Sequence, residues 1–252
     1  FKAAVLKKIK KPLKILDNLK LPKLKRGQVL VKILYSSICR SQIMEIEGKR
    51  GKDKYIPHLL GHEGSGIVEK IGIGVTKVSR GDKVFLSWIK GSGLDTGGIK
   101  IKNNRQILNA GPITTFSSYS IVSENRCFLV PKKFPLRKST IFGCAVPTGA
   151  GIILNEIKPK KKDTVCVIGL GGVGLSVLMA CKMLKMKNIM VIDIDPKKIN
   201  IAKRMGYKKS IIFKNKKLLQ PKILSFTKGK YFDYTIESAG KDKSIEFAFS
   251  IT

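Results

Sequence analysis

The first part of the chain alternates between apolar and polar positions in the manner of β-strands. The segments KAAVLKKI at 2–9 and QVLVKILY at 28–35 both follow this pattern. Short β-branched runs interrupted by glycine continue through 64–88, and two further short strands are expected at 119–131. Short strands separated by glycine turns are typical of all-β architectures, so this half predicts a β-rich, barrel-like domain.

The second part of the chain changes to alternating strands and helices. Short apolar runs at 165–168 and 189–193 are each followed by a helical pattern, and segments at 210–213 and 231–237 supply a third and a fourth strand. Alternation of strand and helix at this spacing predicts a doubly wound parallel sheet with helices on both faces.

The change of pattern predicts two domains joined by a linking helix near 148–158. We expect a first domain over residues 1–147 and a second over 148–252. The order of strands in a dinucleotide-binding fold is 3-2-1-4-5-6, and only four strands are found here. We therefore expect the chain to be incomplete, with its fourth strand an open edge and with little turnover by itself; a naturally shortened enzyme is the alternative.

The charge of the chain is strongly positive, because 50 Lys and Arg residues face 17 Asp and Glu residues, a formal net charge of +33. Such a balance raises the alternative of a non-enzymatic nucleic-acid-binding protein. The 42 Lys outnumber the 8 Arg and are spread along the whole chain. Because base recognition favours Arg, a Lys-rich solvated surface is the preferred interpretation.

The five cysteines form no CxxC pair and no disulfide-like ladder, and no signal peptide opens the chain. A reducing cytoplasm is therefore the expected location. Residues 164–181 carry no charge, but four glycines interrupt them, so a strand, a turn and a buried helix are preferred to a membrane span. Cys127, Cys166 and Cys181 fit no motif and are expected in the core.

A glycine-rich motif, GLGGVG at 169–174, directly follows a predicted strand and opens a predicted helix. Asp193 lies nineteen residues after its last glycine, at the end of the next strand, where a carboxylate can reach the adenosine ribose of a dinucleotide. An acidic side chain there favours NAD over NADP, although Lys197 and Lys198 moderate that preference. A glycine-rich packing turn is the alternative. The expected cofactor-binding positions of this motif are Gly169, Gly171, Gly172, Gly174 and Asp193.

The two histidines both lie in PHLLGHEG at 57–64. This segment, ICRS at 38–41, FGCAVPTG at 142–149 and GLGGVG at 169–174 occur in the order found in one enzyme family. The chain resembles the zinc-dependent alcohol dehydrogenases of the medium-chain dehydrogenase/reductase family over essentially its whole length. The resemblance implies a GroES-like β-barrel catalytic domain followed by a Rossmann domain.

The resemblance implies that Cys39, His62 and Cys144 are the ligands of one catalytic Zn²⁺, a set that leaves the fourth position open to water or substrate. Glu63 follows the ligand histidine, as in the GHE motif of the family, and is expected close to the metal. Ser41 matches the hydroxyl residue that passes the alcohol proton outward.

Three further positions are carried over from the family. Arg40 occupies a position that in some relatives meets the cofactor pyrophosphate, and Thr148 is expected to touch the nicotinamide. Trp88, the only tryptophan, falls where relatives place an aromatic wall of the substrate pocket. Ordinary core packing is the alternative for Trp88.

The chain also departs from the family pattern. Between Trp88 and Ser118 it has none of the four cysteines that hold a structural zinc in many members, so no structural zinc is expected. Gln42 stands where an acidic partner of the zinc-bound histidine is common. Met44 replaces a histidine that extends the proton relay in some relatives.

These departures favour a polyol, sugar alcohol or other secondary alcohol as substrate over ethanol. We expect a cytoplasmic, NAD-dependent zinc oxidoreductase that binds a small-molecule alcohol, with no membrane and no nucleic acid as partner, and a homodimer or homotetramer for the full-length form. The alternative within the family is a glutathione-adduct (formaldehyde) dehydrogenase, which the missing four-cysteine lobe disfavours.

Overall fold

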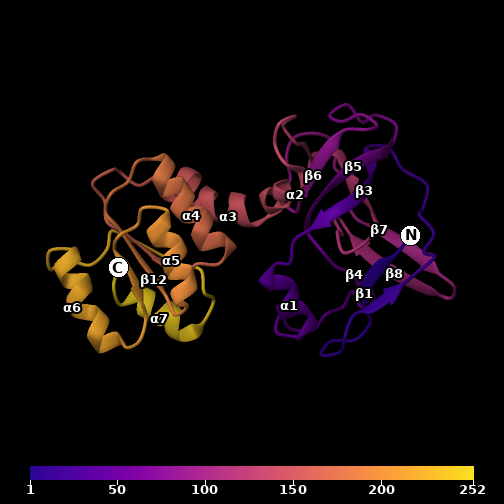
Figure 1. Cartoon of the computed structure of the whole chain (residues 1–252). Helices are drawn as coiled ribbons and strands as arrows, with labels where there is room; N and C mark the ends of the chain where they lie inside the picture. The colour runs from indigo at the N-terminus through magenta and orange to yellow at the C-terminus, as the bar shows by residue number, and fades with distance from the viewer. The chain divides into compact units, whose positions relative to one another are not determined.

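The computed structural model describes all residues from Phe1 to Thr252 (Figure 1). The chain divides into two compact units, Phe1–Cys144 and Ala145–Thr252. Each unit has hydrophobic core clusters of its own, so each is described by itself.

The first unit is built from two five-stranded sheets. Its strands are β1 (Ala3–Leu6), β2 (Lys14–Leu16), β3 (Gln28–Ser36), β4 (His58–Leu59), β5 (Glu63–Ile71), β6 (Lys83–Ser87), β7 (Ile99–Asn103), β8 (Gln106–Gly111), β9 (Tyr119–Ser123) and β10 (Cys127–Leu129). One sheet has the order β2-β1-β4-β8-β7 and the other the order β10-β6-β5-β3-β9. All pairs are antiparallel except β4 with β8, so the predicted β-rich domain is confirmed.

Alternating side chains of these strands form the core of the first unit. Val29 and Val31 of β3 point to the same face and are fully buried beside Val84 and Leu86 of β6. Each such side chain contributes roughly 1.5–3 kcal/mol through burial. A second cluster, around Val5 of β1, includes residues of β4, β7 and β8.

Short helical elements connect the strands of the first unit. They are α1 (Arg40–Ile46), η1 (Glu124–Arg126), α2 (Leu136–Ser139) and η2 (Thr140–Gly143). The helix α1 follows β3 after three residues, and η2 ends directly before Cys144. Cys39 therefore lies directly before α1, and Cys144 lies directly after η2.

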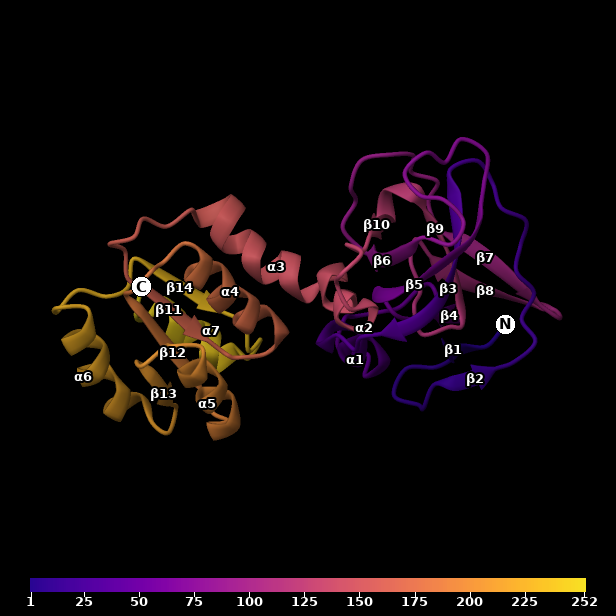
Figure 2. The same ribbon diagram turned by 45° about the horizontal axis from the view of Figure 1, so that its top comes forward.

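The second unit alternates strands and helices, as the sequence predicts. Its elements are α3 (Ala145–Gly151), the π-helix η3 (Ile152–Ile157), β11 (Val165–Ile168), α4 (Gly172–Met183), β12 (Ile189–Asp193), α5 (Pro196–Arg204), β13 (Ser210–Ile212), α6 (Lys216–Phe226), β14 (Tyr234–Glu237) and α7 (Asp242–Phe249). The four strands are all parallel in the order β13-β12-β11-β14 (Figure 2). This is the predicted 3-2-1-4 order.

Two buried clusters cover the two faces of this sheet. Alternate residues of β11 and β12 pack against α4 and α5 on one face, where Val165 and Val191 are fully buried. The intervening residues, among them Cys166 and Ile192, pack against α6 and α7 on the other. Helices therefore cover both faces, and the uncharged stretch at 164–181 is a strand, a turn and a buried helix.

The expected core role of three cysteines is also found. Cys127, Cys166 and Cys181 are at most 1% exposed and lie in three different core clusters. Burial raises the pKa of Cys181 to about 11 and the pKa of Cys127 to about 12, so both stay protonated thiols at neutral pH.

The structure differs from the predicted elements at several places. The fourth strand begins at Tyr234 rather than at 231, because Phe232 packs in the core and Asp233 accepts hydrogen bonds from the backbone and hydroxyl of Thr164. The hairpin of β7 and β8 and the helix α6 were not predicted. Pro221 lies inside α6 and weakens its sequence signal.

By length and hydropathy, no single helix qualifies as a membrane span; one bent helix pair, Leu136–Gly143 with Ala145–Ile157, meets these criteria only when its two parts are taken together.

Candidate metal centre and dinucleotide turn

Cys39, His62 and Cys144 converge in the first unit although they lie far apart in the sequence. Their ligand atoms, the two Sγ atoms and one ring nitrogen, all lie within 4.8 Å of one another. Cys39 directly precedes α1, His62 follows β4, and Cys144 follows η2. Three separate elements thus bring two sulfur donors and one nitrogen donor to one point.

The backbone at Gly61 sets the position of His62. Gly61 has a φ of +96°, and a Cβ atom there would lie 2.4 Å from Thr115 Oγ1 and 2.5 Å from the Phe116 backbone nitrogen. The backbone nitrogens of Thr115 and Phe116 donate to the Leu60 carbonyl in the same turn. Only glycine permits this close approach, so the turn that presents His62 depends on it.

The pKa values of the two thiols of the cluster shift in opposite directions. The neighbouring side chains of Cys144 and His62 lower the pKa of Cys39. The pKa of Cys144 is raised, first by its hydrogen bond to Cys39, then by burial, and further by the negative charges of Cys39 and Glu63. Two adjacent thiolates need a cation to be ionised together.

The buried ring nitrogen of His62 supports the same conclusion. His62 Nε2 is buried and has no hydrogen-bond partner. A buried polar atom without a partner costs roughly 1–3 kcal/mol, which a metal–ligand bond removes. Two thiolates and one imidazole are the donor set of a catalytic zinc with an open fourth position. The residues present therefore fit a Zn²⁺ ion.

Ser41, Glu63 and Trp88 lie around this cluster. The Ser41 hydroxyl donates to Cys39 Sγ at 3.3 Å. Glu63 is 3% exposed and its charge acts on Cys144, as described above. A hydrogen bond from the Trp88 side chain to Cys144 lowers the pKa of that thiol, and Trp88 is 49% exposed. Trp88 is therefore not a core residue.

Gln42 and Met44 lie on α1 as the helix leaves Cys39. Gln42 is 3% exposed and its side-chain carbonyl oxygen has no hydrogen-bond partner. Met44 is half-buried. The structure thus contains no hydrogen bond from His62 to the Gln42 oxygen, the interaction expected of a partner of a metal-bound histidine.

A buried carboxylate, that of Glu124, organises the loops before β6 and β7. Glu124 accepts hydrogen bonds from the backbone nitrogens of Leu94 at 2.8 Å and Thr76 at 2.9 Å. Burial raises the pKa of Glu124, but these backbone donors, with Lys77, outweigh it and hold the pKa below its ordinary value. The Glu124 carboxylate thus ties the loop before β7 to the loop before β6.

The glycine motif of the second unit forms the turn between β11 and α4. Gly169 has a φ of +87°, and a Cβ atom at Gly174 would lie 2.0 Å from the Gly169 carbonyl oxygen. A Cβ at Gly171 would meet nothing within 4 Å, so the outer side of the turn is open. A tight turn with an open backbone at a helix N-terminus is a suitable binding site for a phosphate group.

Asp193 lies beside this turn, at the end of β12. Its Oδ2 atom accepts a hydrogen bond from the Leu170 nitrogen at 2.6 Å, and its Oδ1 atom accepts one from the Asp195 nitrogen at 2.8 Å. The side chain is buried, and Lys198 Nζ lies 3.9 Å from Oδ2. Each carboxylate oxygen keeps a further lone pair for another donor.

Arg40 and Thr148 lie in different units. Arg40 is exposed at the first position of α1 in the first unit. Thr148 is half-buried within α3 in the second unit.

One cluster of potential ligands was missed in the sequence. Glu45, Asp53 and His58 place their ligand atoms within 4.8 Å of one another. They belong to α1, to the following loop and to β4, and their spacings of eight and five residues match no local motif. The only available signal was His58, a second histidine without an assigned role.

Each of the two units matches a known protein family. Residues 25–132 match the family described as "Alcohol dehydrogenase GroES-like domain". Residues 172–252 match the family described as "Zinc-binding dehydrogenase". The two matches follow one another in the order of the two units.

Individual relatives agree with these families. The chain is 31% identical to the alcohol dehydrogenase class-3 of Drosophila melanogaster over 280 aligned residues, covering 100% of this chain and 73% of the relative. It is 33% identical to the alcohol dehydrogenase class-3 of Caenorhabditis elegans, covering 95% of this chain and 69% of the relative. The crystal structure of benzyl alcohol dehydrogenase from Acinetobacter calcoaceticus is similar with a TM-score of 0.86 and 27% identity, covering 99% of this chain and 73% of that one.

Proposed function

Because this chain belongs to the zinc-dependent alcohol dehydrogenase family, we propose that it transfers a hydride from an alcohol, polyol or sugar alcohol to NAD. The observation that carries this proposal is the convergence of Cys39, His62 and Cys144 in the first unit, beside a serine hydroxyl. The departures at Gln42 and Met44 support a secondary alcohol or polyol over ethanol.

Cys39, His62 and Cys144 would hold the metal through two thiolates and one imidazole. Zinc bound there supplies Lewis-acid chemistry that lowers the pKa of an alcohol oxygen. Two thiolates neutralise a dication, which suits a neutral alcohol as substrate. The unpartnered Nε2 atom of His62 and the opposite pKa shifts of the two thiols both support this ligand set.

Ser41 and Trp88 act on the substrate side of this site. The Ser41 hydroxyl, 3.3 Å from Cys39 Sγ, accepts the alcohol proton at its Oγ atom and passes its own proton outward. The half-exposed Trp88 forms an apolar wall of the pocket. Glu63, whose charge raises the pKa of Cys144, stabilises positive charge at the metal site.

The second unit binds the dinucleotide in this proposal, with 1–147 as the catalytic domain and 148–252 as the NAD-binding domain. The backbone nitrogens around Gly171 and Gly172 bind the pyrophosphate, and Asp193 accepts from the ribose hydroxyls. Thr148 contacts the nicotinamide and Arg40 the pyrophosphate.

Metal content and cofactor binding test the proposal directly. The purified chain loaded with Zn²⁺ should hold one tightly bound ion and bind NAD in isothermal titration calorimetry. Cys144→Ala should remove the tight zinc while NAD affinity stays within about twofold, because the turn at Gly169 belongs to the other unit. Cys127→Ala is the matched control, since Cys127 lies in a core cluster of the same unit and should keep its zinc.

Retention of tight zinc in Cys144→Ala, or failure of the wild-type chain to bind NAD, would overturn the proposal. The substrate class is then read from a panel of primary alcohols, secondary alcohols, polyols and a glutathione–formaldehyde adduct, with NADH formation followed by absorbance. Preferential turnover of the adduct would establish the alternative within the family.

A further inference from the structure

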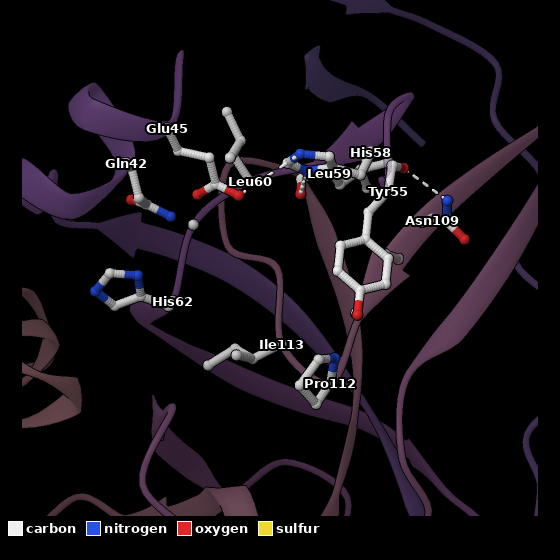
Figure 3. Close-up of a pocket in the computed structure, with 13 residues that line it drawn as sticks. Gln42, Glu45, Tyr55, His58, Leu59, Leu60, His62, Asn109, Pro112 and Ile113 are labelled. Atoms are coloured by element: carbon white, nitrogen blue, oxygen red, sulfur yellow. Dashed lines mark hydrogen bonds and ion pairs between the residues drawn. The ribbon is translucent and has the colours of Figure 1, made fainter. Parts of the chain in front are cut away.

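A second group of ligand atoms lies in the first unit, separate from the two cysteines. His58 Nε2 lies 2.8 Å from Asp53 Oδ2 and 3.6 Å from Glu45 Oε1 (Figure 3 shows His58 and Glu45). The exposed fractions of the side chains are 8% for His58, 12% for Asp53 and 27% for Glu45. The group is therefore mostly buried, with Glu45 on its open side.

The hydrogen bond on the other side of the His58 ring fixes its tautomer. His58 Nδ1 lies 2.9 Å from the Leu59 carbonyl oxygen, which can only accept, so Nδ1 carries a proton. In a neutral imidazole, Nε2 then presents a lone pair to the Asp53 carboxylate, which also presents lone pairs. That arrangement is repulsive unless a proton or a metal cation lies between Nε2 and the two carboxylates.

Both carboxylates are held in the orientation that a cation needs. Asp53 Oδ1 accepts from the Tyr55 backbone nitrogen at 2.8 Å, which leaves Oδ2 directed at His58. Glu45 Oε2 lies 3.9 Å from Arg50, which leaves Oε1 directed at His58.

The spacing of the three ligand atoms suits a small transition ion. Zinc bonds of about 2.0–2.1 Å in tetrahedral geometry place neighbouring ligand atoms about 3.3 Å apart. The measured separations from His58 Nε2, 2.8 Å and 3.6 Å, lie on either side of that value. All three ligand atoms lie within 4.8 Å of one another, close to the spacing that one ion needs.

A cavity of about 430 Å³ adjoins the group and supplies room for water ligands. Its lining includes Glu45, His58 and Asn109 (Figure 3). Gln42 also lines it, is 3% exposed, and has a side-chain oxygen without a hydrogen-bond partner. An ion that carries water ligands in this cavity offers a donor for that oxygen.

We propose that Glu45, Asp53 and His58 form a second cation site, which binds a divalent transition ion such as Zn²⁺ through one imidazole and two carboxylates. Nitrogen and oxygen donors bind zinc without thiolate help, so this ion is the weaker of the two. A proton on His58 Nε2 is the competing occupant, and the experiment below distinguishes the two.

An ion at this site would help to hold the ligands of the catalytic zinc in position. Its ligands join α1, which begins directly after Cys39, to β4, which ends three residues before His62. An ion bound there would link the two segments that carry two of the three zinc ligands. Occupancy is expected to raise the thermal midpoint of the chain beyond the effect of the first zinc.

The test measures zinc stoichiometry and affinity on the full chain. After chelator treatment and titration with Zn²⁺ alone, the wild-type chain should bind two ions in calorimetry, with the weaker one lost in Asp53→Asn. A Cys39→Ala/Cys144→Ala variant should bind a single ion, and adding Asp53→Asn should weaken that binding about tenfold or more.

Two further variants guard against misfolding as an explanation. Glu45→Gln keeps the shape of its side chain and should weaken only the second ion, with an unchanged far-ultraviolet circular dichroism spectrum. Asp17→Asn is the matched control, because Asp17 is an exposed carboxylate paired with Lys2, and it should change neither ion. One zinc per wild-type chain, or a second ion unaffected by Asp53→Asn and Glu45→Gln, would overturn the proposal and leave a proton on His58.

Discussion

Replacement of Asp193 separates a structural role from a role in cofactor binding. The side chain accepts two backbone hydrogen bonds, from Leu170 in the glycine turn and from Asp195 after β12. Asp193 is 6% exposed and Leu170 is 1% exposed, so water cannot replace the lost acceptor at Leu170. The carboxylate therefore holds the turn in shape in addition to its proposed contact with a ribose.

The magnitude follows from the donors left without partners. The buried Leu170 N–H costs roughly 1–3 kcal/mol when it loses its acceptor, and the part-buried Asp195 N–H costs less because water can reach it, so Asp193→Ala should lower the free energy of unfolding by about 2–4 kcal/mol. This is a large share of an ordinary domain stability of about 5–15 kcal/mol. Asp193→Asn keeps one acceptor oxygen and should cost about half as much, while it removes the charge that disfavours a 2′-phosphate.

Urea unfolding and calorimetric titration with NAD and NADP measure the two roles. Asp193→Asn should weaken NAD binding by about 1–3 kcal/mol, roughly 5- to 150-fold in Kd, and narrow the gap to NADP. Asp195→Ala is the control: it removes only the cap of α5, in which Asp195 accepts from Lys197, and should cost about 0.5–2 kcal/mol. Unchanged unfolding and unchanged NAD affinity in Asp193→Asn would refute the reasoning.

Three further predictions follow from other parts of the structure. Gly61→Ala should abolish tight zinc binding in metal analysis, because its Cβ would overlap Thr115, whereas Gly51→Ala, with a φ of +84° and nothing within 4 Å, should keep the zinc. Glu124→Gln should reduce stability at pH 7 by roughly 1–3 kcal/mol in urea unfolding. Because the pKa of Glu124 is lowered in the folded chain, the carboxylate contributes fully to the free energy of unfolding above the ordinary Glu pKa of about 4.3. This contribution is lost as the pH falls, and the unfolding of Glu124→Gln should lack this acid dependence. Added salt should slow NAD association in stopped-flow measurements, because the chain carries a formal charge of +33 and the cofactor is anionic; a rate independent of salt would contradict this.

The architecture of the second unit could be predicted from the residue pattern alone. Strands buried on both faces appear as continuous apolar runs, and β11 and β12 match the predicted ranges 165–168 and 189–193. The parallel order then follows from the alternation with helices. The helix α6 was missed because Pro221 and a run of lysines conceal its apolar positions Leu219 and Ile223.

The metal cluster could not be found from local pattern. Cys39, His62 and Cys144 are separated by 22 and 81 intervening residues, and each lies at the end of a different element. No helical or strand periodicity links such positions, so only the resemblance to a family brought them together. Trp88 illustrates the same limit: its sequence environment left core packing open, and only the fold gives its exposure of 49%.

The group formed by Glu45, Asp53 and His58 could be predicted neither from the residue pattern nor from the resemblance to the family. Its geometry depends on a backbone contact, from His58 Nδ1 to the Leu59 carbonyl, that no sequence motif encodes. That contact places the proton of a neutral ring on Nδ1, so that Nε2 needs either a second proton or a metal cation to face the carboxylates. The same α1 segment that follows Cys39 carries Glu45, so the sequence of this helix serves two sites at once. A change that unwinds α1 is therefore expected to disturb both ions, whereas Glu45→Gln, which keeps the helix, should weaken only the second ion, and changes confined to the second unit should leave both in place.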